Sequence, residues 1–352
     1  MFKQFPDMKT IRNYFRRRRY MRKNRTTPMW GGGFLSDNIE KALDTFLNEE
    51  EKKSSRRLRM LRNDMIDSYI DYGVIPMEYF LMGFEGLDHN ARSRFLCNQH
   101  KDRLMIGKIG MDTYNKELRD KYAFYLRYSD LFKRDVCKIE SQEDKVAFVS
   151  LCSKHSKVIA KPLNGMCGTG CRIIGTEDAE DIFDGLLAEG KWIIEELICQ
   201  NEDMAQWNSS SVNTVRIPSF YNSKGFHIFR PFFRTGRKGA VVDNAAQGGL
   251  FAMIDEQTGV LRTDGMTEYG KTFEKHPESG LTYKGWQIPA WDDLLKTAQK
   301  AHERLKHHPY IGWDFAYTDK GWVLIEGDWG QFLNEFSDKI GIRNEFEMLI
   351  EA

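Results

Sequence analysis

Several common features are missing from this sequence of 352 residues. Charged residues interrupt every apolar stretch well before the about 20 residues that cross a bilayer, so we expect no membrane-spanning helix. The N-terminus has no apolar segment with a small-residue cleavage site, so we expect no secretory signal. Internal repeats and low-complexity tracts are also missing. We therefore expect a globular, cytoplasmic protein, of about two domains at this length.

Cysteine motifs are missing as well. No two cysteines form a CxxC pair, and no histidines follow at zinc-finger spacing, so we expect no structural zinc. In a cytoplasmic protein we expect the cysteines to be reduced thiols. They stand at positions 97, 137, 152, 167, 171 and 199.

The net charge of +1 hides a strong asymmetry. Residues 1–25 contain ten Lys/Arg and one Asp, a local net charge of +9, so the remaining residues carry −8. Three interpretations of this basic arm stay open: a basic helix without a partner, a helix that binds anionic lipid, and a nucleic-acid-binding segment. No base-reading motif accompanies the charge, so we expect no nucleic acid. A peripheral contact of residues 11–25 with an anionic membrane, at its inner face, is one expectation that follows.

The pattern of apolar residues changes along the chain. Residues 36–132 are mostly helical in pattern, with Ser36 to Asn38 as an expected helix cap and a later helical stretch over 114–132. After Val136, short β-like runs separated by glycine-rich turns follow. The expected strands cover 158–161, 172–174, 192–195, 212–220, 226–233, 312–317 and 322–326, and the expected later helices cover 178–188 and 291–305. This order predicts an antiparallel α+β region after a helical one.

A glycine-rich loop follows the β-like run that ends at Lys161. Glycines let backbone N–H groups approach phosphate oxygens, and the lysine adds a positive charge for the same anion. The loop is no Walker motif, because no Gly-Lys-Ser/Thr ends it and a strand rather than a helix follows. A hairpin turn without a ligand is the alternative. The glycines are Gly165, Gly168 and Gly170, with Thr169 among them.

A second apolar strand ends at two carboxylates, Glu195 and Glu196. Backbone groups where such a strand leaves the core can bind the edge of an adenine ring. The alternative is a buried strand with a charged end.

The segment from Ile311 to Asp328 predicts a hairpin, with Asp319-Lys320-Gly321 as its turn. If the hairpin is centred on Lys320, residues whose numbers sum to 640 face each other. Asp314 then lies opposite Glu326, and Asp328 shares their face because side chains alternate. Three carboxylates on one patch repel unless a cation lies between them, and oxygen ligands favour Mg²⁺ or Mn²⁺. An exposed acidic hairpin is the alternative.

Two arginines stand on β-like segments between these motifs, Arg216 and Arg234. The planar fork of arginine suits a transferring phosphoryl group or an anionic substrate. Salt bridges on the surface are the alternative.

Together these residues resemble the ATP-grasp superfamily, and in particular its branch associated with sugar transfer and surface polysaccharides, which is related to alpha-L-glutamate ligases. The resemblance covers roughly residues 60–335. It rests on Lys161-Pro162 with its glycine loop, Ile194-Glu195-Glu196, Asn213-Thr214-Val215-Arg216, Arg234-Thr235-Gly236, Val242-Asp243-Asn244 with Gly248-Gly249, His276-Pro277, Gly285 with Ile288-Pro289-Ala290-Trp291, Gly312-Trp313-Asp314 and Ile325-Glu326-Gly327.

The resemblance implies an ATP-grasp fold in which two α+β subdomains grip ATP after a helical N-terminal region. Together with the charge of the N-terminus and the apolar pattern, it predicts four segments: a basic amphipathic arm at 1–35, a helical domain at 36–135, a small subdomain with the glycine loop at 136–205, and a C-terminal subdomain with the metal site at 206–352. The sequence lacks the Rossmann-like N-terminal domain of many ATP-grasp ligases.

The resemblance also implies residue roles. Lys121 and Lys161 would contact ATP phosphates, under a loop from Gly165 to Gly170. Arg216 and Arg234 would stabilise the transferring phosphate or an acyl phosphate. The segment of Glu195, Glu196, Leu197 and Ile198 would hold adenine, Glu202 or Asp203 would contact the ribose, and Asp314, Glu326 and Asp328 would bind Mg²⁺, with Mn²⁺ as the other candidate.

The implied activity is that of an ATP-dependent ligase, which joins a carboxylate to an amine through an acyl phosphate. The substrates would be linked to a glycan or a polysaccharide precursor. Asp328 departs from the family, which usually has Asn there, and this leaves the number of metal ions open. Two alternatives remain: a phosphotransferase on the same fold, and a nucleotide-binding scaffold at the membrane.

Overall fold

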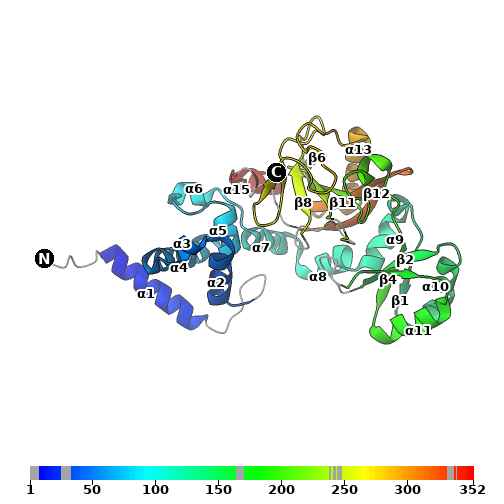
Figure 1. The fold of residues 1–352 in the computed structure, drawn as a ribbon, viewed down its shortest axis with the longest axis horizontal. Helices are drawn as coiled ribbons and strands as arrows, with labels where there is room; N and C mark the ends of the chain where they lie inside the picture. Colours follow the sequence, from blue (N-terminus) through cyan, green and yellow to red (C-terminus); the bar gives the residue numbers. More distant parts are fainter. Residues whose placement is uncertain are drawn as a thin grey trace. The chain divides into compact units, whose positions relative to one another are not determined.

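The computed structural model describes residues 8–24, 33–163, 170–237, 239–240, 243, 248–330, 337 and 339–352. The chain forms two compact units (Figure 1). The first comprises Met1–Leu104 with Asp338–Glu347, and the second Met105–Ser337 with Met348–Ala352. Within the described ranges, no helix is both long and apolar enough to cross a membrane.

The first unit is helical. Helix α2 begins at Leu35 with Phe34 as its N-cap, so the expected cap at Ser36 to Asn38 is wrong, and these residues lie in the first turn. Its apolar positions Ile39 and Leu43 are buried, as their spacing predicts. The helices are α1 (Met8–Lys23), α2 (Leu35–Phe46), α3 (Glu49–Lys52), α4 (Ser55–Tyr72), α5 (Pro76–Leu81), α6 (His89–Ser93) and α7 (Asn98–Ile109), which runs on into the second unit; α15 (Arg343–Glu351) lies near the C-terminus.

The second unit begins with short helices before its first sheet. The expected helical stretch over 114–132 is interrupted at Asp120, because the Asp120 carboxylate accepts hydrogen bonds from the backbone N–H groups of Tyr122 and Ala123 and caps a new helix. The elements are α8 (Met111–Tyr114), a π-helical turn η1 (Asn115–Arg119) and α9 (Lys121–Phe132).

A four-stranded antiparallel sheet follows, in the order β1-β4-β2-β3. Helices α10 (Lys145–Cys152) and α11 (Ala179–Glu189) cover one face of it (Figure 1), and alternate apolar side chains of the strands pack against them. The opposite face carries Lys161 and Glu195. The strands are β1 (Val136–Ile139), β2 (Lys157–Pro162), β3 (Arg172–Gly175) and β4 (Trp192–Glu196), with a short η2 (Gln142–Asp144) after β1.

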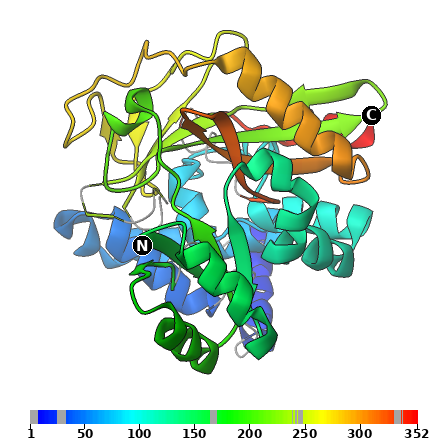
Figure 2. The ribbon, with the colours of Figure 1, turned by 90° about the vertical axis from the view of Figure 1, so that its right-hand side faces the viewer.

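The larger sheet has eight antiparallel strands in the order β10-β9-β8-β7-β5-β11-β12, with β6 paired to β5. Helix α13 (Trp291–His302) packs on one face, against β5, β11 and β12 (Figure 2). The strands are β5 (Thr214–Asn222), β6 (Gly225–Ile228), β7 (Phe232–Thr235), β8 (Leu250–Met253), β9 (Gly265–Met266), β10 (Thr272–Phe273), β11 (Tyr310–Thr318) and β12 (Gly321–Asp328). Two further short helices in the described ranges are α12 (Glu202–Ala205) and η4 (Glu303–Leu305).

One expected strand, 226–233, is in fact two. Arg230 has a positive φ of 48°, and Pro231 cannot donate a ladder hydrogen bond, so the chain breaks between β6 and β7. The α+β class with antiparallel sheets after a helical N-terminal region is confirmed.

Candidate active site

The centre of the larger sheet carries a row of charged residues. Arg216 on β5 pairs in register with Asp314 on β11, and Asp314 pairs with Glu326 on β12. Directly opposed residues of neighbouring strands project to the same face, so the three side chains lie side by side. This face is the one opposite to α13, because Trp313 and Phe315 point into the buried core on the other side.

The pairing of Asp314 with Glu326 confirms the prediction from the hairpin, but the strand register between this pair and the turn differs from the predicted register. At the tip, Thr318 pairs with Gly321, and the register continues to Phe315 opposite Leu324. A β-bulge at Ile325 then shifts the register by one residue, which places Glu326 opposite Asp314. Gly312 faces Asp328, so Asp328 projects from the same face as Glu326.

Two arginines neutralise most of this acidic patch. Arg216 contacts both oxygens of Asp314, through Nε and through Nη2 at 2.7 Å, and its Nη1 lies 2.7 Å from Asp328 Oδ1. Arg234 Nη2 lies 2.6 Å from Asp314 Oδ2. Asp314 is 1% exposed, and both arginines hold the pKa of its carboxyl below the ordinary value although burial acts in the opposite direction.

Glycine at position 330 makes room for this arrangement. A Cβ atom there would lie 2.2 Å from Arg216 Nη1 and 2.6 Å from Asp328 Oδ1. The backbone N–H of Gly330 also donates to Asp328 Oδ1 at 2.6 Å. A side chain at position 330 would therefore push Arg216 away from Asp328.

Glu326 differs from its neighbours. Its side chain is exposed to solvent and has neither an ion pair nor a hydrogen bond to any residue in the described part of the chain. Although this residue reaches solvent, the protein packed around its carboxyl group limits the hydration of the charged form, and the charges of Asp314 and Asp328 add to this effect. Together they raise the pKa of Glu326 to about 7.

This donor set fits a divalent cation. Three carboxylates share one face, and one of them, Glu326, has no partner among the described residues. Loss of hydration is the main cause of its raised pKa, and the negative charges of Asp314 and Asp328 add to it. Carboxylate oxygens are the ligands that Mg²⁺ and Mn²⁺ prefer. Glu326 and Asp328 are the accessible members, and Asp314 would join them where an arginine moves aside.

Lys161 lies on the four-stranded sheet, in a buried charge network. Its Nζ lies 2.6 Å from Glu195 Oε1, and Arg134 contacts Glu195 Oε2 at 2.6 Å through Nη2. Glu195 is 3% exposed. Burial alone would raise the pKa of Glu195, but Lys161 and Arg134 outweigh it and lower the pKa to about 2. Both oxygens of the Glu195 carboxylate thus already have charged partners within the protein.

Lys121, the first residue of α9, contacts the backbone of Pro162 and Leu163, where the chain leaves β2 and enters the glycine loop. Its Nζ donates to the carbonyl oxygens of Pro162 at 2.6 Å and Leu163 at 3.2 Å. Burial lowers the pKa of Lys121, while Glu326 raises it and Lys161 lowers it further. The charges of Glu326 and Lys161 therefore both act on the Lys121 ammonium group.

The other predicted nucleotide-binding residues lie at the end of β4, on α12 and in the glycine loop. Glu196 ends β4 and accepts a hydrogen bond from the Asp135 backbone N–H, and Leu197 and Ile198 follow at the end of that strand. Asp203 lies exposed on α12. Gly170 has a positive φ of 77°, whereas Gly165, Gly168 and Thr169 lie outside the described residues.

Sequence reasoning missed several residues around the charged row. Thr214 accepts a hydrogen bond from Arg234 Nε at 2.9 Å and donates to Asp243, which fixes the arginine. Tyr114 stacks on Trp329 with 4.0 Å between ring centroids, directly after Asp328. Of these, Thr214 and Asp243 lay within motifs of the resemblance, but their contact across 29 residues left no local signal.

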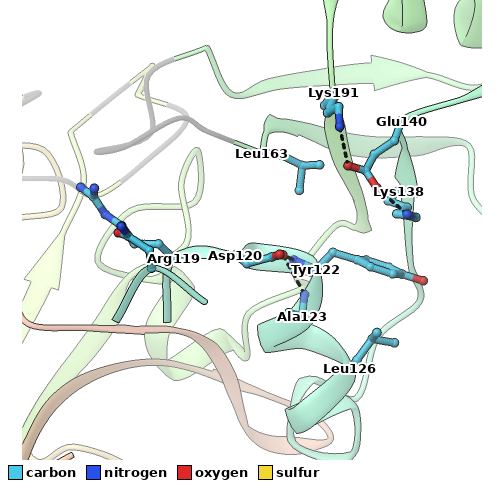
Figure 3. Close-up of a pocket in the computed structure, with 10 residues that line it drawn as sticks. Arg119, Asp120, Tyr122, Ala123, Leu126, Lys138, Glu140, Leu163 and Lys191 are labelled. Atoms are coloured by element: carbon cyan, nitrogen blue, oxygen red, sulfur yellow. Dashed lines mark hydrogen bonds and ion pairs between the residues drawn. The ribbon is translucent and has the colours of Figure 1, made fainter. Parts of the chain in front are cut away.

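A groove of about 640 Å³ lies between the start of α9 and the end of the four-stranded sheet (Figure 3). In one wall, Lys191 at 3.1 Å and Lys138 both contact the carboxylate of Glu140. The other wall holds Tyr122 and Leu126. The volume suits a small molecule. The two lysines share the single carboxylate of Glu140, so one positive charge among these three residues is left uncompensated.

A comparison of the sequence with models of known protein families identifies the family of this chain. The profile described as sugar-transfer associated ATP-grasp matches residues 130–346. The chain belongs to this family. ATP-grasp proteins use ATP with a divalent metal, so the expectations of an ATP-grasp enzyme, of ATP and of a divalent ion are confirmed at that level. A comparison with curated proteins finds no match.

Among solved structures, the chain is similar to D-alanyl-alanine synthetase A from Vibrio cholerae, with 11% identity over 69% of this chain and 66% of that one and a TM-score of 0.42. It is similar to D-alanine–D-alanine ligase from Helicobacter pylori, with 17% identity over 66% and 60% and a TM-score of 0.42. The ATP-grasp ligase PsnB, complexed with a minimal precursor, has 12% identity over 86% and 75% and a TM-score of 0.41. The chain thus spans about two thirds or less of the first two proteins.

Proposed function

We propose that this protein is an ATP-dependent carboxylate–amine ligase that forms an amide bond on a glycan-linked or polysaccharide-precursor substrate. The observation that carries the proposal is Glu326, a carboxylate without a partner among the described residues, between Asp314 and Asp328 and in a row with Arg216. Such a patch suits a divalent ion that accompanies nucleotide phosphates. The description of the family supports the link to sugar transfer.

The proposed roles follow from the contacts. Lys121 and Lys161 would bind ATP phosphates. Lys121 would first release the carbonyl oxygens of Pro162 and Leu163, and Lys161 would release Glu195. Leu197 and Ile198 would hold adenine, and Asp203 would contact the ribose. The residues of 136–205 and 206–352 would form the two subdomains that enclose the nucleotide, with 165–170 as the phosphate loop.

The proposed chemistry has two steps. A carboxylate oxygen of the substrate attacks the γ-phosphorus, which gives an acyl phosphate and ADP. An amine then attacks the acyl carbon, an amide forms, the amine loses a proton and phosphate leaves. A divalent ion at the carboxylates would supply positive charge, and Arg216 and Arg234 would offset the charge that develops on the transferring oxygens.

We also propose that the protein contacts the inner face of an anionic membrane through residues 11–25. The net charge of this segment and its lack of acidic residues after Asp7 support this contact.

One experiment tests the reaction class. The purified protein is incubated with ATP, Mg²⁺, cell-derived acceptors and a pool of amino acids, and products are identified by mass spectrometry. A ligase releases ADP and phosphate together with an amide product. Release of ADP alone with a phosphorylated acceptor would identify a phosphotransferase, and would refute the ligase proposal.

A further inference from the structure

Helix α1 has a one-sided charge. Between Arg12 and Lys23 it carries seven cations, and the whole helix from Met8 to Lys23 contains no acidic residue. A cluster of this kind can be neutralised within the protein or can remain available to a partner. The contacts of α1 with α4 in the same unit distinguish the two cases.

One face of α1 packs on α4 and has its charge neutralised. Arg16 forms an ion pair with Asp71, and Arg17 Nη1 lies 2.6 Å from Asp67 Oδ2. Tyr20 completes this face, with its ring centroid 6.1 Å from that of Tyr69. Tyr20 follows Arg16 by four residues and Arg17 by three, so both arginines lie on the same side of the helix as Tyr20.

The other face is exposed and its charge is not neutralised. Phe15 is 63% exposed and Tyr14 is 48% exposed. Arg18, Arg19 and Arg22 are spaced three, four and seven residues after Phe15, so they surround its ring on one side of the helix. The exposed cations of α1, none of which forms an ion pair with a described residue, are Arg12, Arg18, Arg19, Arg22 and Lys23.

We propose that this aromatic–cationic face, formed by Phe15 with Tyr14 and those five cations, docks on an anionic lipid bilayer. The cations complement lipid phosphates and carboxylates, and the Phe15 ring at their centre can enter the boundary between headgroups and acyl chains. At 16 residues, α1 would lie flat on the surface over about 24 Å. A single helix face is convex, whereas single-stranded nucleic acid is bound in grooves.

This inference deepens the proposed membrane contact by naming the residues that make it. It does not depend on the ligase chemistry, because no residue of the ATP site takes part. A failure of membrane binding would leave the proposed ligase reaction untouched. A failure of the ligase assay would likewise leave the proposed membrane contact untouched.

The first test compares two double variants in the full-length protein. Arg18→Gln/Arg19→Gln removes two charges from the exposed face, and Arg16→Gln/Arg17→Gln removes two from the packed face. Binding is measured by co-sedimentation with phosphatidylcholine vesicles that contain about 30% phosphatidylserine. We expect the exposed-face variant to bind about tenfold more weakly or worse, and the packed-face variant to lose no more than about threefold. Equal losses in both variants would overturn the proposal.

The packed-face variant leaves Asp67 and Asp71 without their partners and can loosen α1, so a second measurement is needed. Phe15→Trp places a fluorophore at the centre of the exposed face without changing charge. We expect its emission to shift to shorter wavelength with the anionic vesicles but not with pure phosphatidylcholine. An unchanged emission, or a shift that appears only with a single-stranded oligonucleotide, would refute the membrane assignment.

Discussion

The guanidinium of Arg216 holds both oxygens of the Asp314 carboxylate and also contacts Asp328. Two of the three predicted metal ligands thus have an arginine as their counter-ion. A divalent ion that binds here has to compete with Arg216, unless the arginine turns to the phosphates of a bound nucleotide. Metal and nucleotide binding should therefore depend on each other.

The first prediction concerns this competition. Arg216→Met removes the counter-ion but keeps much of the volume, so we expect a lower melting temperature in metal-free buffer because buried carboxylates lose their partner. We also expect Mn²⁺ alone to raise the melting temperature more than in the unmodified protein. Arg237→Met, which breaks the more exposed pair with Glu278, is the control and should change neither. If Mn²⁺ raises the melting temperature of Arg216→Met no more than that of the unmodified protein, Arg216 does not compete with the metal ion.

The second prediction concerns Lys161. Because Lys161 is expected to bind ATP phosphate, Lys161→Ala should weaken ATP binding in calorimetry with Mg²⁺ present by about tenfold or more. Lys157→Ala is a matched control, since Lys157 lies exposed on the same strand, four residues earlier. Equal affinity of the Lys161 variant and the unmodified protein would mean that this strand does not face the nucleotide.

The third prediction concerns Glu326. Glu326→Gln removes the carboxylate with the raised pKa, so we expect the melting temperature in metal-free buffer above pH 7 to stay unchanged or to rise. The added stabilisation from ATP with Mg²⁺ should disappear, and turnover with it. A Glu326→Gln protein that keeps the full shift with ATP and Mg²⁺ would place the metal elsewhere.

The fourth prediction concerns Asp328, where the resembled family usually has Asn. Asp328→Asn keeps an oxygen ligand and removes one charge, so we expect activity to persist with a changed requirement for Mg²⁺. The measurement is a titration of turnover with Mg²⁺. Complete loss of activity, similar to that expected for Glu326→Gln, would show that the extra charge of Asp328 is needed.

The fifth prediction concerns pH and the helical unit. Burial raises the pKa of Glu78 to about 7, against hydrogen bonds from Asn98 and Ile75. The folded protein therefore keeps a proton that the unfolded chain releases, so the free energy of unfolding should fall between about pH 5 and pH 8. In Glu78→Gln this fall should shrink by on the order of 3 kcal/mol, as measured by urea unfolding at both pH values. Parallel curves for the two proteins would contradict the raised pKa.

Much of the fold followed from local patterns. The turn at Asp319 to Gly321 and the alternation on either side predicted the hairpin, and the opposition of Asp314 and Glu326 was correct. The centre of the turn was placed half a residue too far along, which shifts every pairing partner near the tip by one residue, and the bulge at Ile325 compensated for that error. A bulge depends on packing around the strand, which spacing alone does not encode.

The charge networks could not be predicted in the same way. Arg134 and Glu195 are 61 residues apart and Arg216 and Asp314 are 98 apart, so their contacts arise only when the strands assemble. The sequence could therefore indicate which side chains carry charge, but not that Glu195 and Asp314 are already paired within the protein.

The bulge at Ile325 also bears on how the hairpin tolerates insertions and deletions. Removal of Ile325 alone would leave a regular ladder in which Asp314 still faces Glu326, because the residues on either side are already in register with one another. Removal of one residue between Phe315 and Tyr317 would instead set Asp314 against Leu324, an apolar side chain. Length variation in this hairpin should therefore be tolerated at one position of β12 and be damaging on the neighbouring stretch of β11.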